Sequence, residues 1–428
     1  MTSFPAPTDG QADFDDRAAA LDAADPLADF HDLFVQHDGV VAYLDGNSLG
    51  RPVAATAARL ERFVEREWGE RLIRAWDEQW IDAAVALGDR IGRVALGAAA
   101  GQTVVADSTT VLLYKLVRAA VDAVPERREI VADVENFPTD RYVIEGVAAE
   151  RGLTVRWITP DPAAGVTADE VRAVVGPQTA LVLLSHIAYK SGYVADVAEI
   201  TRVAHEAGAL VLWDLCHSAG AVPVHLDDHG VDLAVGCSYK YLNGGPGAPA
   251  FAYVAERLHG RLRQPVQGWF GAADPFAMGP GYEPAPGIRQ IVSGTPPILA
   301  LQPIHEMVAL IERAGIERIR AKSTQLTDYV IAYAEQLLVP LGVRVATPSD
   351  PERRGSHVTL EHPEFRDVTA ELWRRGVIPD FRPPQGIRIG LSPLSTSFGE
   401  VARGLAVLRE VLADRIGSEA QGSGESAS

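Results

Sequence analysis

Between residues 104 and 254 the sequence alternates short apolar runs with segments of helical periodicity. The runs at 128–134, 179–187 and 210–215 contain few polar residues, whereas the apolar residues of 167–175 and 195–207 recur at helical spacing. Strands that are apolar on both faces are typical of parallel sheets covered by helices on both sides. The alternation therefore predicts a large α/β domain built on a mainly parallel sheet.

The same pattern predicts the other elements of this domain. Thr167 and Glu170 form a Thr-x-x-Glu capping box at the start of one helix, and another helix is expected to begin near Thr109. Further strands are expected at 104–108, 154–158, 231–238 and 248–254.

After about residue 298 the pattern changes to long amphipathic helices followed by short strands and two further helices. This change predicts a smaller α+β domain at the C-terminal end. We expect a mobile segment at 1–25, a large domain at 26–300, a small domain at 301–415 and a disordered tail at 416–428, since both ends are rich in small and polar residues.

Charge and cysteine content exclude several classes of protein. The 57 acidic residues exceed the 39 basic ones, which gives a net charge of −18 and argues against a general binder of nucleic acid or of anionic membranes. No apolar run is long enough for a membrane span, and the first residues do not resemble a signal peptide. Cys216 and Cys237 are too few for a disulfide framework or a CxxC metal site, so we expect no metal and a cytoplasmic location.

Two polar clusters follow apolar runs at the expected carboxyl edge of the sheet, where such folds bind ligands. Asp214 and His217 follow one run, and Lys240 lies between two tyrosines before a glycine-rich loop. A carboxylate there can pair with a pyridinium nitrogen, and a buried lysine forms imines readily. A helix-capping aspartate and a solvent-reaching lysine are the alternatives, but the spacing of 26 residues, one β-unit, allows both side chains to face one site.

Two more clusters extend the pattern. The segment 107–110, Asp-Ser-Thr-Thr, begins a predicted helix and can form an anion cradle, and Phe137 in the segment 137–140 can stack on a flat ring. Each alone is an ordinary helix cap or loop. Together the four clusters supply a phosphate cradle, a stacking aromatic, a carboxylate and an imine-forming lysine, which indicates a pyridoxal-phosphate enzyme of fold type I.

The chain resembles the kynureninases from about residue 40 to 412. The shared motifs are YLDGNSLG (43–50), LIRAW (72–76), NFPTD (136–140), SHIAYKSGY (185–193), WDLCHSAGAVPV (213–224), GCSYKYLNGGPG (236–247), GWFG (268–271), SGTPPI (293–298), RGSHVTLEHP (354–363) and RIGLSPL (388–394). The resemblance implies a homodimer with shared active sites, the cofactor pyridoxal 5'-phosphate, and hydrolysis of L-kynurenine to anthranilate and L-alanine in tryptophan catabolism. It implies slower hydrolysis of 3-hydroxykynurenine.

The resemblance also implies roles for individual residues. Lys240 is the imine lysine, Asp214 is the partner of the pyridinium nitrogen, and Tyr239 is the candidate proton donor, which also contacts the cofactor. The remaining cofactor contacts are Ser108, Thr109, Phe137, Pro138, Thr139, Asp140 and His217 from the same chain, and Trp269 and Thr295 from the neighbouring subunit.

The substrate end of the site is implied by the same resemblance. Arg388 matches the arginine that binds the substrate α-carboxylate, a task that suits its planar fork. Trp76 and Ser48 match substrate-pocket positions, with a core tryptophan and a turn serine as the alternatives. Threonine rather than asparagine at position 295 resembles the bacterial forms that favour kynurenine over 3-hydroxykynurenine.

Three other functions share parts of this pattern. A cysteine desulfurase or selenocysteine lyase has the same fold but needs a cysteine on a mobile loop, whereas Cys216 and Cys237 lie beside the cofactor strands. An aminotransferase of the same fold is the second alternative. A non-catalytic binding protein is the third, and such a protein is expected to lose Lys240 or Asp214.

Overall fold

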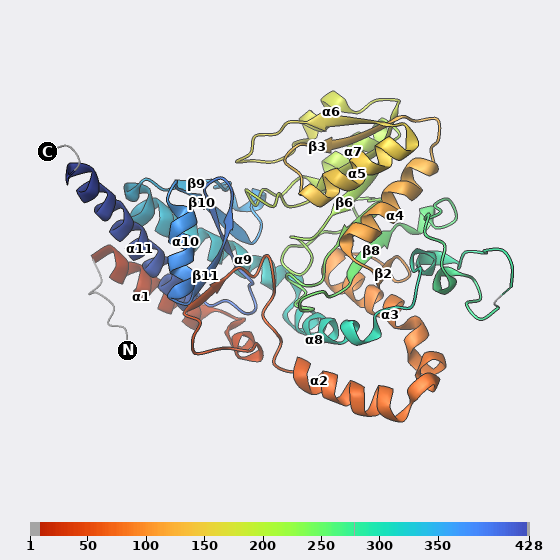
Figure 1. Cartoon of the computed structure of the whole chain (residues 1–428), viewed down its shortest axis with the longest axis horizontal. Coiled ribbons are helices and arrows are strands. Elements are labelled where there is room, and N and C mark those ends of the chain that lie inside the picture. The colour runs from red at the N-terminus through yellow and green to blue at the C-terminus, as the bar shows by residue number, and fades with distance from the viewer. Residues whose placement is uncertain (1–8, 278, 426–428) are drawn as a thin grey trace.

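A computed structural model describes residues 9–277 and 279–425, arranged in two domains that each contain one sheet (Figure 1). The larger sheet has seven strands, and β8 is the only antiparallel one among the described residues. Its spatial order is β2 (Thr103–Ala106), β8 (Ala250–Val254), β7 (Leu233–Gly236), β6 (Leu210–Asp214), β5 (Thr179–Ser185), β3 (Glu129–Asp133) and β4 (Thr154–Ile158). The predicted, mainly parallel sheet is confirmed.

Helices cover both faces of this sheet, and the strand side chains alternate between them. In β5, Leu181 and Leu183 belong to one apolar cluster, whereas Val182 and Leu184 belong to the other. Helices α4 (Thr109–Asp122) and α5 (Pro138–Arg151) contribute to the first cluster. Helices α6 (Ala168–Val174), α7 (Val197–Glu206) and α8 (Ile298–Ala314) contribute to the second, and α3 (Ile81–Ile91) contributes to both. The predicted capping box of Thr167 and Glu170 is present.

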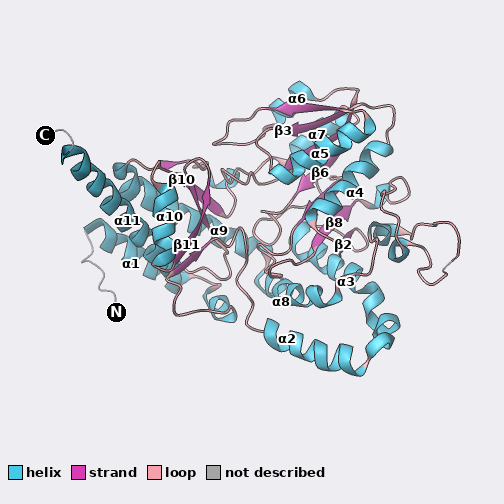
Figure 2. Cartoon of the chain, in the orientation of Figure 1, coloured by secondary structure: helices cyan, strands magenta, loops and turns pink. Residues whose placement is uncertain are grey.

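The smaller sheet lies to one side of the first (Figure 2). Its order is β1 (Ala42–Leu44), β11 (Val377–Arg382), β12 (Gly386–Gly390), β10 (His357–Glu361) and β9 (Arg344–Val345). Helices α9 (Ile316–Tyr333), α10 (Phe365–Arg374) and α11 (Phe398–Glu425) pack against it. Strand β1 comes from the segment that we expected in the large domain, and α8, expected in the small domain, packs on α2 (Thr56–Arg62) and α3.

Both ends of the chain differ from the sequence prediction. Helix α1 (Asp9–Ala24) lies within the segment 1–25 expected to be mobile, yet it packs along α11, with Phe14 and Ala18 buried in the small-domain core (Figure 1). Helix α11 continues through Glu425, into the expected tail at 416–428. Residues 1–8 and 426–428 lie outside the described part of the chain. Across the described residues, no helix combines the length and the apolar character needed to cross a membrane.

Candidate active site

The sequence-predicted residues meet in a pocket at the carboxyl edge of the large sheet. It encloses about 470 Å³ of space that is partly open to solvent. The lining residues are Thr109, Thr110, Phe137, Thr139, Asp140, Ser185, Tyr189, Asp214, Cys216, His217, Tyr239 and Lys240. Of the residues expected to contact the cofactor from the same chain, only Ser108 and Pro138 are not part of this lining. They form the N-cap of α4 and the first residue of α5.

Lys240 and His217 form a contact at the centre of the pocket. The Lys240 Nζ lies 2.9 Å from His217 Nε2 and 5.8 Å from the centroid of the Phe137 ring. Burial, and then the positive charge of Lys240, lowers the pKa of His217. The imidazole is therefore neutral, and its Nε2 can accept a hydrogen bond from the lysine ammonium.

A pair of buried carboxyl groups is formed by Asp214, at the end of β6, and Asp140, in the first turn of α5. The backbone N–H of Cys216 donates to Asp214 Oδ1 at 2.7 Å. Burial raises the pKa of Asp140 well above its usual range, and the negative charges of Asp214 and Asp133 raise it further. The raised pKa favours the protonated, uncharged form of Asp140 beside Asp214.

The start of α4 forms an anion-binding cradle. Ser108 caps this helix, and its hydroxyl accepts a hydrogen bond from the Val111 N–H at 3.4 Å. The Thr109 Oγ1 is buried and has no hydrogen-bond partner among the described residues. Free backbone N–H groups, the positive end of the helix dipole and an unpartnered hydroxyl together favour a bound phosphate.

Arg388 lies at the interface between the two domains, where it is almost completely buried. Its Nε donates to Asp380 Oδ2 at 2.8 Å, its Nη1 to the backbone oxygen of Tyr189 at 2.7 Å, and its Nη2 to Ser48 Oγ at 3.0 Å. Because Tyr189 also lines the pocket, Arg388 and Ser48 adjoin it on the small-domain side.

Besides Ser108, Pro138, Arg388 and Ser48, three further sequence-predicted residues lie outside the pocket lining. Trp76 packs edge-on against Trp80 and Phe270, at centroid distances of 5.4 and 5.6 Å. Trp269 is 40% exposed, and Thr295 is also exposed. Within one chain, therefore, these residues do not line the pocket that contains Lys240.

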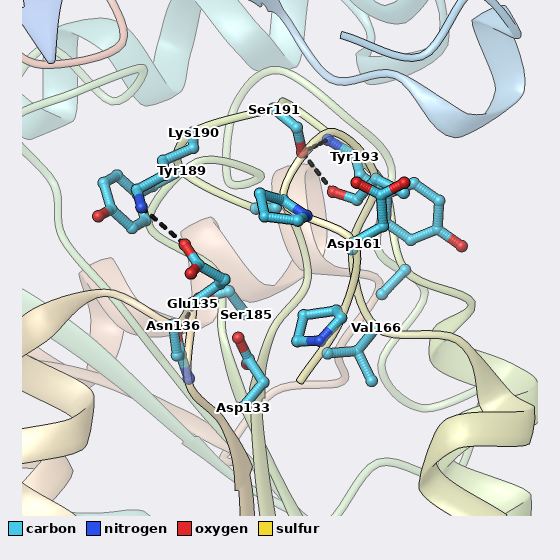
Figure 3. Close-up of a pocket in the computed structure, with 16 residues that line it drawn as sticks. Asp133, Glu135, Asn136, Asp161, Val166, Ser185, Tyr189, Lys190, Ser191 and Tyr193 are labelled. Carbon is cyan, nitrogen blue, oxygen red and sulfur yellow. Dashed lines mark hydrogen bonds and ion pairs between the residues drawn. The ribbon is translucent and has the colours of Figure 1, made fainter. Parts of the chain in front are cut away.

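A second pocket of about 450 Å³ adjoins the first and shares Ser185 and Tyr189 with it (Figure 3). Glu135 on its wall is paired with Lys190, at 2.6 Å between Oε2 and Nζ. Asp133 lies at the same wall, and burial raises its pKa to about 7. The first pocket is thus bordered by a second, more acidic one.

Sequence reasoning missed three residues of the site. Ser185 ends β5 directly beside Asp214 in the sheet register, so the strand-end signal that found Asp214 also applies to it. Asp380, the partner of Arg388, lies on β11, which the sequence pattern did not predict. Tyr189 lies in a loop, where no periodic signal identifies it.

The geometry fits pyridoxal phosphate. The unpartnered Thr109 hydroxyl and the α4 N-terminus suit a phosphate, and Asp214 suits a protonated ring nitrogen. Phe137 and His217 offer rings on which the cofactor can stack, and Lys240 supplies an amine in the same pocket.

Comparisons with known proteins agree with this fit. Residues 92–249 match the family model for Cys/Met metabolism PLP-dependent enzymes, and residues 319–408 match that for the kynureninase C-terminal domain. Similar solved structures include a cysteine desulfurase from Thermococcus onnurineus NA1, with a TM-score of 0.76 and 17% identity over 87% of this chain and 95% of that one. At this identity the likeness shows the fold alone.

Relatives with much higher identity are kynureninases. The Pseudomonas fluorescens kynureninase is 43% identical over 94% of this chain and 96% of that protein. The Burkholderia pseudomallei kynureninase is 40% identical over 93% of this chain and 95% of its own length. Since these alignments span nearly the whole of each protein, the chain belongs to the kynureninase family of pyridoxal-phosphate-dependent enzymes.

Proposed function

We propose that this chain hydrolyses the bond between Cβ and Cγ of L-kynurenine and releases anthranilate and L-alanine, as a step of tryptophan catabolism. The observation that carries this proposal is the position of Arg388 at the edge of the pocket that holds Lys240 and Asp214. An α-amino acid held there by its carboxylate has its amino group directed toward the lysine. When bound, pyridoxal phosphate supplies a conjugated ring that takes up the electron pair left on the substrate carbon.

The large-domain residues hold the cofactor and move protons. Lys240 would hold the cofactor through its Nζ, and as a free amine this nitrogen would take the Cα proton of the substrate. Neutral His217 accepts a hydrogen bond from this nitrogen and limits where it can lie. Asp214 would pair with the protonated ring nitrogen, and the raised pKa of neighbouring Asp140 disfavours a second negative charge there.

The small domain and Tyr239 act on the substrate. The Arg388 fork binds the α-carboxylate, with Ser48 beside it. Water adds to the γ-carbonyl, and the Cβ–Cγ bond breaks so that the electron pair remains on Cβ. Burial raises the pKa of Tyr239 above its usual range, so its hydroxyl stays protonated at neutral pH and can donate the proton that Cβ requires.

We also propose a homodimer in the cytoplasm. The exposed positions of Trp269 and Thr295 suit residues that reach a neighbouring subunit's site, and threonine at 295 favours kynurenine over its 3-hydroxy form. Trp76 is proposed to contribute to the substrate pocket from its position beside Phe270. Both cysteines are free and buried, which suits a reducing compartment.

The test is incubation of the purified protein, loaded with pyridoxal phosphate, with L-kynurenine and with 3-hydroxykynurenine. Anthranilate, followed by its fluorescence, is expected from kynurenine, and a lower rate is expected with the 3-hydroxy substrate. Lys240→Ala is expected to remove the absorbance band of the lysine-bound cofactor and nearly all turnover. Formation of a keto acid instead of anthranilate and alanine would indicate an aminotransferase and refute the proposal.

A further inference from the structure

Lys115 is a buried cation beside the cofactor pocket that the mechanism does not use. It lies on α4, two turns after the start of the helix, and has no exposed surface. Its Nζ lies 2.6 Å from Asp107 Oδ2 and 2.8 Å from the backbone oxygen of Ile291. A fully buried lysine is rare unless it is paired, so its two partners explain its place.

Asp107 is the residue that turns the chain from β2 into α4. It has a left-handed backbone, with φ at +47°, and its carbonyl accepts a hydrogen bond from the Ala250 N–H at 3.0 Å. Ser108 and Thr109 follow directly, so the conformation of Asp107 aims the helix N-terminus at the pocket. The turn places a carboxylate next to the phosphate cradle, where its charge opposes that of a phosphate.

Lys115 offsets this repulsion between like charges. The ion pair neutralises the Asp107 carboxylate on the side away from solvent and fixes the side chain against the helix. The second contact, to Ile291, ties the same cation to the segment that leads to Thr295. One buried ammonium therefore holds both the turn that shapes the cradle and the chain that leads to the proposed intersubunit residue.

We propose that Lys115 is a positioning residue for the cofactor phosphate. It acts through Asp107, by neutralising the carboxylate of the residue that directly precedes the Ser108 cap and by holding the turn that aims the helix N-terminus. The inference rests on the assigned cofactor and on the place of its phosphate at α4, and it does not depend on which substrate is cleaved.

The test compares the binding of two ligands to the apoenzyme, pyridoxal 5'-phosphate and pyridoxal, which lacks the phosphate. Both are followed by the absorbance of the ligand bound to Lys240. In Lys115→Met, we expect the dissociation constant of pyridoxal phosphate to rise on the order of tenfold or more, because the charge of Asp107 is no longer neutralised. The dissociation constant of pyridoxal is expected to change less than about twofold. An equal loss of affinity for both ligands, or no loss for the phosphate form, would overturn the proposal.

Two further variants distinguish the effect of the Asp107 charge from a failure to fold. Asp107→Asn keeps a residue that tolerates the left-handed backbone, and it is expected to retain or increase the preference for the phosphate form. Lys115→Met/Asp107→Asn is expected to recover most of the affinity that Lys115→Met loses. If Asp107→Asn itself lowered the affinity for pyridoxal phosphate about tenfold relative to that for pyridoxal, the carboxylate would not oppose the phosphate and the proposal would fail. This result would be decisive even if Lys115→Met did not fold.

Lys190 offers a matched control. It is also a lysine paired with a carboxylate near the pocket, but its partner is Glu135 rather than the residue that precedes α4. Lys190→Met is expected to leave the ratio of the two dissociation constants unchanged. A wild-type protein that bound both ligands normally but did not cleave kynurenine would refute the proposed function and leave this inference standing.

Discussion

At the scale of single residues, the two tyrosines that flank Lys240 lie in different surroundings. Tyr239 lines the cofactor pocket, whereas Tyr241 is buried and its hydroxyl donates to the backbone oxygen of Ser356 at 3.2 Å. The sequence alone could not separate them, because both adjoin the lysine. We therefore keep Tyr239 as the proposed proton donor and use Tyr241 as its control.

Tyr239→Phe is expected to lower kcat by about 10²–10⁴-fold, the range usual for the loss of a general acid. The affinity for pyridoxal phosphate is expected to change little, since the cradle and Lys240 remain. Steady-state kinetics with kynurenine and a cofactor titration measure the two effects. Tyr241→Phe removes a hydroxyl at the same sequence distance from Lys240 and should retain kcat within a fewfold range. Equal loss in both variants would contradict the assignment.

Asp133 is a buried carboxyl group, and its contribution to the free energy of unfolding depends on pH. Burial raises its pKa from 3.8 to about 7. The folded state thus holds this proton more tightly than the unfolded state, so the free energy of unfolding falls as pH rises from about 4 to 7, and the loss persists above pH 7. Asp133→Asn is expected to stabilise the apoenzyme more at pH 8 than at pH 5, by about 2 kcal/mol.

Urea unfolding of the apoenzyme at the two pH values measures this difference. Asp161→Asn is the control, since Asp161 is on the wall of the same pocket but is exposed. Because this side chain is not buried, the variant is expected to lack the rise between pH 5 and pH 8. If Asp133→Asn raised the free energy of unfolding equally at both pH values, the raised pKa of Asp133 would be contradicted.

At the scale of elements, the sequence predicted the strands that are buried on both faces. Strands β3, β5 and β6 are continuous apolar runs because each is covered by helices on both sides, and all three lie within the predicted ranges. Their ends led to Asp214 before any family was considered. The order of the strands, and thus which strand ends adjoin, is set by long-range pairing that local periodicity does not contain.

The elements that were missed have weak local signals. Strand β1 has only three residues, and β11 contains Pro379, which lacks the N–H that a strand normally donates. Asp380, the residue that fixes Arg388, was missed with β11. Helix α1 was expected to be mobile because it is rich in alanine and aspartate, although Phe14, Ala18 and Leu21 recur at helical spacing.

Helix α1 is therefore expected to stabilise the small domain. The Phe14 ring packs edge-on against Tyr329 and Tyr333, at centroid distances of 5.6 and 5.0 Å, and the Tyr329 hydroxyl donates to the Phe14 backbone oxygen. Phe14→Ala is expected to cost about 3 kcal/mol of the free energy of unfolding, the lower end for a buried phenylalanine. Chemical unfolding measures it. Tyr142→Ala, which removes an exposed ring on α5, is the control, and an equal small cost in both would show that α1 is not docked.

At the scale of the whole molecule, apolar side chains are exposed in two segments far from the small domain. One is the arm that follows α2, with Trp68, Leu72 and Ile73, and the other is the loop with Trp269 and Phe276 (Figure 1). Exposed large apolar side chains gathered in this way are typical of surfaces that another subunit covers. We propose that the second subunit of the homodimer covers both segments and that Trp269 contributes to that subunit's active site.

Mixing two inactive variants tests whether the sites are shared. In a Lys240→Ala subunit the lysine is missing but Trp269 is intact, and in a Trp269→Ala subunit the reverse holds. If Trp269 serves its neighbour, a mixed dimer contains one site with both native residues and one with neither. Equal mixing yields about half mixed dimers, each with one of two sites restored, so about one quarter of wild-type activity is expected. Differently tagged subunits show whether mixed dimers form. If they form without any gain in activity, Trp269 acts within its own chain and the shared site is excluded.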